Sequence, residues 1–343
     1  MLYPTLKVLC KTACKCYFSK IEFNGLENIP KGDVPVVYTS NHHSAFLDAI
    51  LLAVFSDTPI YFLARADVFS GALGKFLEAI NMMPIYRQVD GYKNLSRNEA
   101  IFSKCNKLLK ENKRILIFPE GSQSELFYLR PLTKGIARIA LNTQSELSED
   151  LYVMPMGLTY FNQYNSGRKV VMSFGKPIIA KDYMALFEEN NNKAYRAILQ
   201  DINDGIKEQL VIPELTDDYP IQIQSLNRAN EKYPFAEIRE KFSNGDYNKT
   251  SKKYPALKLL KWLLFLPNLP IMLVMLFILG KLTTNPLFIA SMKIAFAALL
   301  FPLWLLICFL ITSLSFGLPW AAAILGIQVL SLYLIPKVSR FIY

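Results

Sequence analysis

The C-terminal part of the chain contains a long stretch without a charged residue, which limits the environments in which it can fold. Between Ile294 and Pro336 there is no Asp, Glu, Lys or Arg. Ile294–Phe316 supplies 23 residues, enough for a helix to cross a hydrocarbon core of about 30 Å. Gly317-Leu318-Pro319 interrupts the run, and Pro319–Ile335 can return. The pattern predicts a transmembrane helical hairpin; a hairpin buried in a protein core is the alternative.

An earlier apolar segment, Trp262–Gly280, is also uncharged but is interrupted by Pro267-Asn268-Leu269-Pro270. Cations flank the apolar segments, at Lys258, Lys261, Lys281, Lys293, Lys337 and Arg340. If Trp262–Gly280 lies in the interface or re-enters, all of these cations share one side of the membrane, as the positive-inside rule favours. We therefore predict a membrane region at 253–343 with an interfacial or re-entrant segment at 262–280 and spans at about 294–316 and 319–335. Three spans is the alternative.

The charge balance also favours a membrane partner. Lys and Arg number 38 and Asp and Glu 28, a net charge of +10, which suits a domain held against an anionic membrane face. Residues 1–20 place apolar side chains near helical spacing with lysines interspersed. This predicts a basic amphipathic helix on the membrane surface, with packing onto the domain as the alternative. The sequence has no basic cluster interleaved with base-stacking aromatics, so we expect no nucleic-acid partner.

The five cysteines form an odd set. Cys10, Cys14 and Cys16 lie close together in sequence without a nearby fourth ligand, so we expect no metal site there. Free thiols are ordinary in a reducing compartment. Together with the basic flanks, they predict an integral membrane protein whose globular domain lies on the cytoplasmic face.

Residues 21–180 alternate short apolar runs with helical stretches. Strands are expected at Ile21–Asn24, Val34–Thr39, Ile60–Ala64, Arg114–Phe118, Leu151–Leu158 and Lys169–Phe174, and helices at Leu73–Ile80 and Asn98–Glu111. The alternation predicts an α/β domain with a largely parallel sheet flanked by helices. Residues 181–252 are polar and helix-prone, which predicts a helical extension and linker to the membrane region.

The chain has only two histidines, and they are adjacent, at His42 and His43. His43 stands five positions before Asp48 and follows an apolar run. If His43 lies in a loop before a helix, the Asp48 carboxylate can reach back to one ring nitrogen, fix the tautomer and stabilise the imidazolium. We predict that His43 accepts a proton from a substrate hydroxyl; a helix cap beside a structural histidine is the alternative. We expect His42 to pack or to line the pocket.

Two further stretches indicate ligand binding. The apolar run Ile115–Phe118 ends in Pro119-Glu120-Gly121-Ser122, which puts a carboxylate and flexible backbone at the edge of the sheet where α/β proteins bind ligands. Lys134 precedes a helical stretch whose first N–H groups suit a phosphate or carboxylate. Another short apolar run ends at Arg87, whose planar guanidinium is suited to phosphate.

Taken together, the order and spacing of these motifs resemble the glycerolipid acyltransferase family, which includes glycerol-3-phosphate and lysophosphatidate acyltransferases. Its first block is an Asn-His followed by four residues and an Asp, matched from His43 to Asp48. The next three are a Pro-Ile-x-Arg stretch, a Phe-Pro-Glu-Gly stretch and a hydrophobic strand with a central proline, matched by Pro84–Arg87, Phe118–Gly121 and Tyr152–Gly157. The resemblance covers roughly residues 20–180.

The resemblance implies a membrane-bound O-acyltransferase that moves a fatty acyl group from a thioester of coenzyme A or acyl carrier protein to a hydroxyl of glycerol-3-phosphate, lysophosphatidate or a related lysolipid. It implies no cofactor, no metal and no acyl-enzyme. His43 would be the base and Asp48 its orienter. Arg87 would contact the acceptor phosphate, and Glu120 with Gly121 would form part of the acceptor pocket, next to Ser122 and Lys134.

The sequence departs from this family at three places. Gln123 stands where an arginine is often found, Asn81 where a glycine is usual, and Thr133-Lys134 where a basic pair is usual. These departures weaken the expected phosphate clamp more than the acyl transfer. Two other functions remain as alternatives: a catalytically silent membrane-anchored lipid-binding protein, and a serine hydrolase using Ser44 or Ser122, for which the sequence lacks a Gly-x-Ser-x-Gly elbow.

Overall fold

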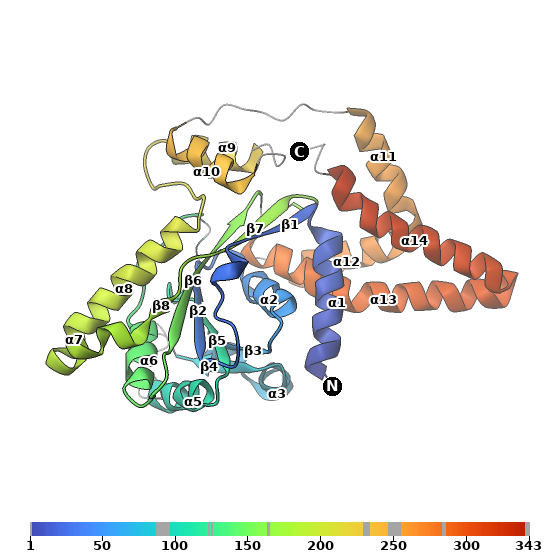
Figure 1. Ribbon diagram of the computed structural model, residues 1–343. Coiled ribbons are helices and arrows are strands. Elements are labelled where there is room, and N and C mark those ends of the chain that lie inside the picture. Colours follow the sequence, from blue (N-terminus) through green and yellow to red (C-terminus); the bar gives the residue numbers. More distant parts are fainter. Residues whose placement is uncertain are drawn as a thin grey trace.

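Figure 1 shows the protein as a computed structural model. The structure describes residues 2–86, 97–122, 124, 126–162, 165–228, 234–245, 255–282 and 286–339. They form an α/β domain followed by long apolar helices at the C-terminal end. The predicted fold class is therefore confirmed.

The sheet has eight strands in the described residues, at β1 (Lys20–Asn24), β2 (Val36–Ser40), β3 (Ile60–Arg65), β4 (Met82–Ile85), β5 (Arg114–Ile117), β6 (Tyr152–Tyr160), β7 (Lys169–Phe174) and β8 (Ile178–Ile179). The order is β1-β7-β6-β2-β5-β3-β4, with β8 paired to β6. All pairings are parallel except those of β6 with β7 and β8. The carboxyl ends of β2, β5 and β6 therefore meet at one edge, where ligands bind in parallel α/β sheets.

Helices cover both faces of the sheet, as alternation along the strands requires. Val36 and Tyr38 of β2 pack in a cluster with residues of α1 (Leu2–Tyr17) and α2 (Phe46–Phe55). Val37, between them, packs in a second cluster with α5 (Asn98–Lys110), α6 (Gly135–Gln144) and α8 (Asn191–Glu208). Strands β2, β5, β6 and β7 are buried on both faces, which explains why they read as continuous apolar runs.

The helical extension contains α7 (Met184–Glu189), α8, α9 (Tyr219–Arg228) and α10 (Phe235–Ser243). In α8 the buried residues Ala194, Ile198, Ile202 and Ile206 recur every four positions, which places them on one face of the helix. Asn190 caps this helix because its side-chain oxygen accepts the N–H of Lys193 at 3.0 Å. The division of the chain into domains at about residues 20, 180 and 252 stays a prediction.

In the part of the chain that the structure describes, three helical segments are long and apolar enough to cross a membrane: Ala256–Leu282, Ile289–Phe316 and Leu318–Ser339. The first consists of α11 (Pro255–Phe265), a short 3-10 turn η5 (Leu266–Asn268) and α12 (Leu269–Leu282); the others are α13 (Ile289–Phe316) and α14 (Leu318–Ser339). Figure 1 shows α13 and α14 as a hairpin whose turn projects away from the sheet. Gly317 makes that turn, with a φ of 88° that favours glycine.

The Pro267-Asn268 interruption of the first apolar segment is fixed by polar contacts to α14. Asn268, fully buried, donates to Gln328 O at 3.1 Å and to Ser331 Oγ at 2.8 Å. Gln328 in turn donates to Pro267 O. The segment is long enough to span, which makes it a third candidate, while its interruption fits the interfacial or re-entrant placement predicted from the sequence.

The basic N-terminal helix α1 lies between the sheet domain and the apolar α13–α14 hairpin (Figure 1). It packs on α2, α13 and α14, and buries Ala13, Cys14 and Tyr17. Lys7 Nζ donates to Ser56 O beyond the end of α2, at 2.5 Å. Leu2 and Val8 stay exposed. The helix thus packs onto the protein, the alternative to a purely surface helix, and its exposed apolar side chains remain available to a membrane surface.

Candidate active site

The two histidines lie in a loop that is anchored to the sheet on one side and to α2 on the other. Asn41, the first residue after β2, pairs with β6: its Nδ2 donates to Leu158 O at 2.9 Å, and its Oδ1 accepts from Leu158 N at 2.8 Å. Helix α2 begins at Phe46, after four intervening residues. The side chains of His42 and His43 therefore project from a short segment that is held in place at the carboxyl edge of the sheet.

The ring of His42, not that of His43, is paired with Asp48. His42 Nδ1 lies 2.8 Å from Asp48 Oδ2. The His42 ring also stacks on Phe118, with centroids 4.0 Å apart and planes 10° from parallel. Its side chain is 17% exposed, so the ring combines a buried carboxylate partner with access to the surface. The structure thus places on Asp48 the histidine that we expected to pack or to line the pocket.

His43 occupies a different environment from the one predicted. Its backbone N–H, and not its ring, donates to Asp48 Oδ2 at 2.9 Å. Its ring is buried against Phe127, with centroids 4.4 Å apart, and neither ring nitrogen has a hydrogen-bond partner among the described residues. Successive side chains of an extended segment point to opposite sides. Because Asp48 Oδ2 binds both the His42 ring and the His43 backbone N–H, the ring of His43 points away from the carboxylate.

Asp48 is fully buried and accepts four hydrogen bonds. Oδ2 receives the His42 ring and the backbone N–H groups of His43 and Ser44, the last at 2.8 Å. Oδ1 receives the hydroxyl of Tyr160, at the end of β6, at 2.5 Å. Burial and the neighbouring Asp48 raise the pKa of Tyr160 well above its usual value, which keeps this hydroxyl protonated as a donor. Sequence reasoning missed Tyr160, although it ends the strand of the fourth motif.

Glu120 joins the histidine loop to the loop that follows β5. Its Oε1 accepts the backbone N–H of His42 at 2.7 Å, and its Oε2 accepts Arg130 Nε at 2.6 Å. Arg130 also donates from Nη1 to Ser122 Oγ at 2.6 Å and from Nη2 to Ser122 O. Burial raises the pKa of Glu120, and the Arg130 guanidinium opposes that rise. Both oxygens of Glu120 are engaged within the protein, where the side chain joins the two loops; its place in the acceptor pocket stays a prediction.

The remaining predicted site residues lie in or near this second loop. Gly121 has a φ of 68°, and a Cβ on it would lie 3.2 Å from the methyl carbon of Thr133, so the turn requires glycine. Lys134 is exposed at the start of α6, beside Thr133, whose N–H donates to Pro119 O. Arg87 and Gln123 lie outside the described residues, and their roles stay predictions.

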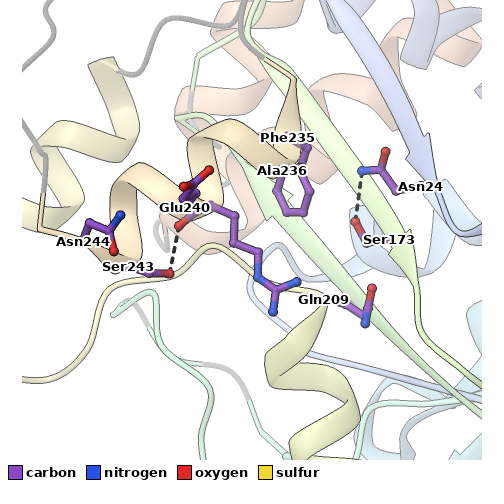
Figure 2. A pocket seen from close by; sticks show the side chains of 9 residues that line it. Asn24, Ser173, Gln209, Phe235, Ala236, Glu240, Ser243 and Asn244 are labelled. Atoms are coloured by element: carbon purple, nitrogen blue, oxygen red, sulfur yellow. Dashed lines mark hydrogen bonds between the residues drawn. The ribbon is translucent and has the colours of Figure 1, made fainter.

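A cavity of about 550 Å³ lies elsewhere in the domain. Figure 2 shows its walls: Phe235, Ala236 and Glu240 of α10 face Asn24 and Ser173 of the neighbouring strands β1 and β7. None of the predicted site residues lines it. We therefore identify the candidate site from hydrogen-bond geometry at the carboxyl edge of the sheet. Within the described ranges, no group of three or more His, Cys, Asp or Glu side chains is placed to hold a metal ion.

The burial of His43 predicts a pH-dependent stability. Burial lowers the pKa of His43 to about 3, against roughly 6.5 in an unfolded chain. Between pH 3 and pH 6.5 the unfolded chain binds one more proton at His43 than the folded protein does. The contribution of the neutral His43 ring to the free energy of unfolding is therefore fully present above pH 6.5 and is lost as the pH falls toward 3. At pH 5 the loss is on the order of 2 kcal/mol.

Thermal unfolding of wild type and His43→Gln, followed by circular dichroism in detergent between pH 7 and pH 5, tests this. The wild-type Tm should fall more steeply than that of His43→Gln, since glutamine does not titrate. Parallel curves for the two proteins would show that His43 is not buried as a neutral ring.

Comparison with known proteins finds similarity over the part of the chain that contains these loops. The acyltransferase family model matches residues 20–159. The chloroplastic 1-acyl-sn-glycerol-3-phosphate acyltransferase BAT2 of Brassica napus is 29% identical over 187 residues, 51% of this chain and 50% of that protein. Glycerol-3-phosphate O-acyltransferase 1 of Saccharomyces cerevisiae is 30% identical over 112 residues, 32% of this chain and 15% of that protein.

Among solved structures, the 1-acyl-sn-glycerophosphate acyltransferase PlsC from Thermotoga maritima aligns with a TM-score of 0.41 and 19% identity, over 60% of this chain and 81% of that one. The chain spans half or less of the length of the two curated relatives above. The matched segment contains β1 to β6 and both loops that form the candidate site. Residues 20–159 thus match the acyltransferase family.

Proposed function

We propose that this protein is a membrane-bound O-acyltransferase that transfers a fatty acyl group from an acyl thioester to a hydroxyl of glycerol-3-phosphate, lysophosphatidate or a related lysolipid. The observation that carries the proposal is the pairing of His42 Nδ1 with the buried carboxylate of Asp48. The family match supports the class of reaction. The curated relatives, by their names, act on glycerol phosphates, which supports the class of acceptor.

His42, rather than His43, is the base in this proposal. With Nδ1 on Asp48, Nε2 takes the proton of the acceptor hydroxyl, and Asp48 stabilises the imidazolium that forms. The acceptor oxygen attacks the thioester carbonyl carbon and gives a tetrahedral intermediate. The intermediate collapses with cleavage of the carbon–sulfur bond, and the imidazolium returns its proton to the departing thiolate. No side chain of the enzyme is acylated.

Glu120, Arg130 and Ser122 keep the second loop beside His42. Because Glu120 binds the His42 backbone N–H, displacement of that loop would move the base itself. Arg87 is proposed to contact the acceptor phosphate, and Lys134 beside the start of α6 to contribute positive charge. The donor is proposed to be acyl-CoA or acyl carrier protein thioester, and the catalytic domain to lie on the cytoplasmic face with the α13–α14 hairpin spanning the bilayer.

The proposed function is tested with membranes that contain the full chain. Radiolabelled palmitoyl-CoA and palmitoyl acyl carrier protein are each offered with glycerol-3-phosphate, lysophosphatidate, lysophosphatidylcholine or lysophosphatidylethanolamine, and the products are resolved by mass. We expect an ester product with a phosphorylated glycerol acceptor that is absent from membranes containing His42→Ala. Lipid binding without transfer to any of these acceptors would contradict the proposal and favour a catalytically silent lipid-binding protein.

A further inference from the structure

The loop between His43 and α2 makes a tight turn in a conformation that alanine rarely adopts. Ala45 has φ 48° and ψ −129°, close to the first central position of a type II′ turn, where glycine is the usual residue. The backbone N–H of Leu47 donates to Ser44 O at 3.0 Å, the hydrogen bond that closes such a turn. A buried alanine in this conformation needs support from its surroundings.

A serine from the membrane region supplies that support. Ser291, in the first turn of α13, is 1% exposed. Its hydroxyl donates to Ser44 O at 2.7 Å and accepts from Leu47 N at 3.0 Å. These are the same two backbone groups that the turn itself joins. One hydroxyl, 244 residues away from Leu47 in sequence, therefore holds both ends of the strained turn.

The turn leads directly to the catalytic pair. The N–H groups of Ser44 and His43, on its N-terminal side, both donate to Asp48 Oδ2, the oxygen that also binds His42. The turn joins this segment to α2, whose first turn carries Asp48. If the turn relaxed to a conformation that alanine prefers, the start of α2 would shift relative to the His43 and Ser44 N–H groups, and the carboxylate would lose part of what fixes its position beside the imidazole.

The first turns of α13 are fixed against the domain, so Ser291 is a rigid support. Ala290 and Ile294 are buried in the same core cluster as residues of α1 and α2. Phe288, just before the helix, contacts Phe46 at the start of α2, with ring centroids 6.0 Å apart. Figure 1 shows α13 passing behind α1 to reach this region.

We propose that Ser291 is a positioning residue for acyl transfer: it holds the Ala45 turn in the conformation that places Asp48 against His42, and so links the membrane helix α13 to the catalytic pair. This inference rests on the proposed function. In this proposal Ser291 contacts neither the His42 ring nor the substrate, and its hydroxyl acts only through the turn.

The test compares Ser291→Ala with the double variant Ser291→Ala/Ala45→Gly in proteoliposomes, using the donor and acceptor that the wild type turns over. Ser291→Ala is expected to lower kcat about tenfold, the size of one lost buried hydrogen-bonding group, with both KM values within twofold of wild type. Glycine adopts the turn without strain, so the double variant is expected to recover at least a third of the wild-type kcat. Ser315→Ala, at an exposed position of the same helix, is the matched control and should keep wild-type activity.

An unchanged kcat in Ser291→Ala would overturn the proposal. So would a failure of Ala45→Gly to restore activity to a variant that still melts within a few degrees of wild type, because the hydroxyl would then act through packing and not through the turn. If Ser291→Ala alone does not yield folded protein, Ser291→Thr, which keeps the hydroxyl, should retain more of the wild-type kcat than Ser291→Val, which has the same shape without it; equal values would contradict the proposal. Absence of transfer by the wild type would instead refute the proposed function.

Discussion

Replacing Asp48 with asparagine is expected to lower kcat for acyl transfer about 10³-fold while leaving most of the fold intact. An asparagine carboxamide can keep the local geometry: its oxygen can accept the three N–H donors now on Oδ2, and its NH₂ can donate to the Tyr160 hydroxyl oxygen. The variant therefore removes chiefly the negative charge. Without that charge the imidazolium formed in the transition state loses its stabilising partner, which in triad enzymes is among the largest single effects.

Tyr160→Phe is the control that separates the effect of the Asp48 charge from the effect of its hydrogen-bond geometry. This change removes the hydrogen bond to Oδ1 but keeps the carboxylate and its contacts to the histidine loop. We expect it to lower kcat by about tenfold or less. Single-turnover rates in the same proteoliposomes measure both variants. A rate for Asp48→Asn within tenfold of wild type would show that proton transfer does not depend on this carboxylate.

Much of the domain could be predicted from local pattern. Strands β2, β5, β6 and β7 are buried on both faces, so each appears in the sequence as a short apolar run, and β7 was expected at its observed bounds, Lys169–Phe174. The two-residue strand β8 was not expected, because Ile178–Ile179 follows a Gly-Lys-Pro sequence that reads as the end of the core. Its existence depends on pairing with Tyr152 and Val153 of β6, which no local pattern reveals.

The pairing within the candidate site differs from the sequence-based expectation. Asp48 lies where the loop-and-helix argument put it, but the spacing from His43 to Asp48 suggested the wrong ring. The turn at Ala45, which has a positive φ, takes up one residue of the loop. The Asp48 carboxylate therefore reaches the ring of His42, six positions earlier, rather than that of His43, five positions earlier. A positive φ at an alanine leaves no sign in the sequence.

Partners that are distant in sequence were also missed. Tyr160 lies 112 positions from Asp48 and Ser291 lies 244 positions from Leu47. Each contact exists only because β6 lies beside β2 and the first turn of α13 packs on the start of α2. The ion pair of Arg130 with Glu120 likewise depends on how two loops fold over each other. Tertiary packing, not residue type, determines these contacts.

The second prediction with a large effect compares the loss of kcat when each of the two neighbouring histidines is replaced. His42 carries the Asp48 hydrogen bond on its ring and has surface access, whereas the His43 ring is buried against Phe127 and burial keeps it neutral. Loss of the base is expected to lower kcat by about 10³-fold or more. Loss of the His43 ring leaves its backbone N–H on Asp48, so the effect on kcat should be about tenfold or less.

Glutamine is the matched replacement for both rings, because it keeps a polar side chain of similar length without a group that can accept and return a proton at neutral pH. The decisive measurement is the initial rate of acyl transfer by His42→Gln and His43→Gln in proteoliposomes of equal protein content, at saturating donor and acceptor. We predict that His43→Gln retains at least a tenth of the wild-type rate and that His42→Gln falls about 10³-fold below it. The reverse order, with His42→Gln active and His43→Gln inactive, would contradict the assignment of His42 as the base.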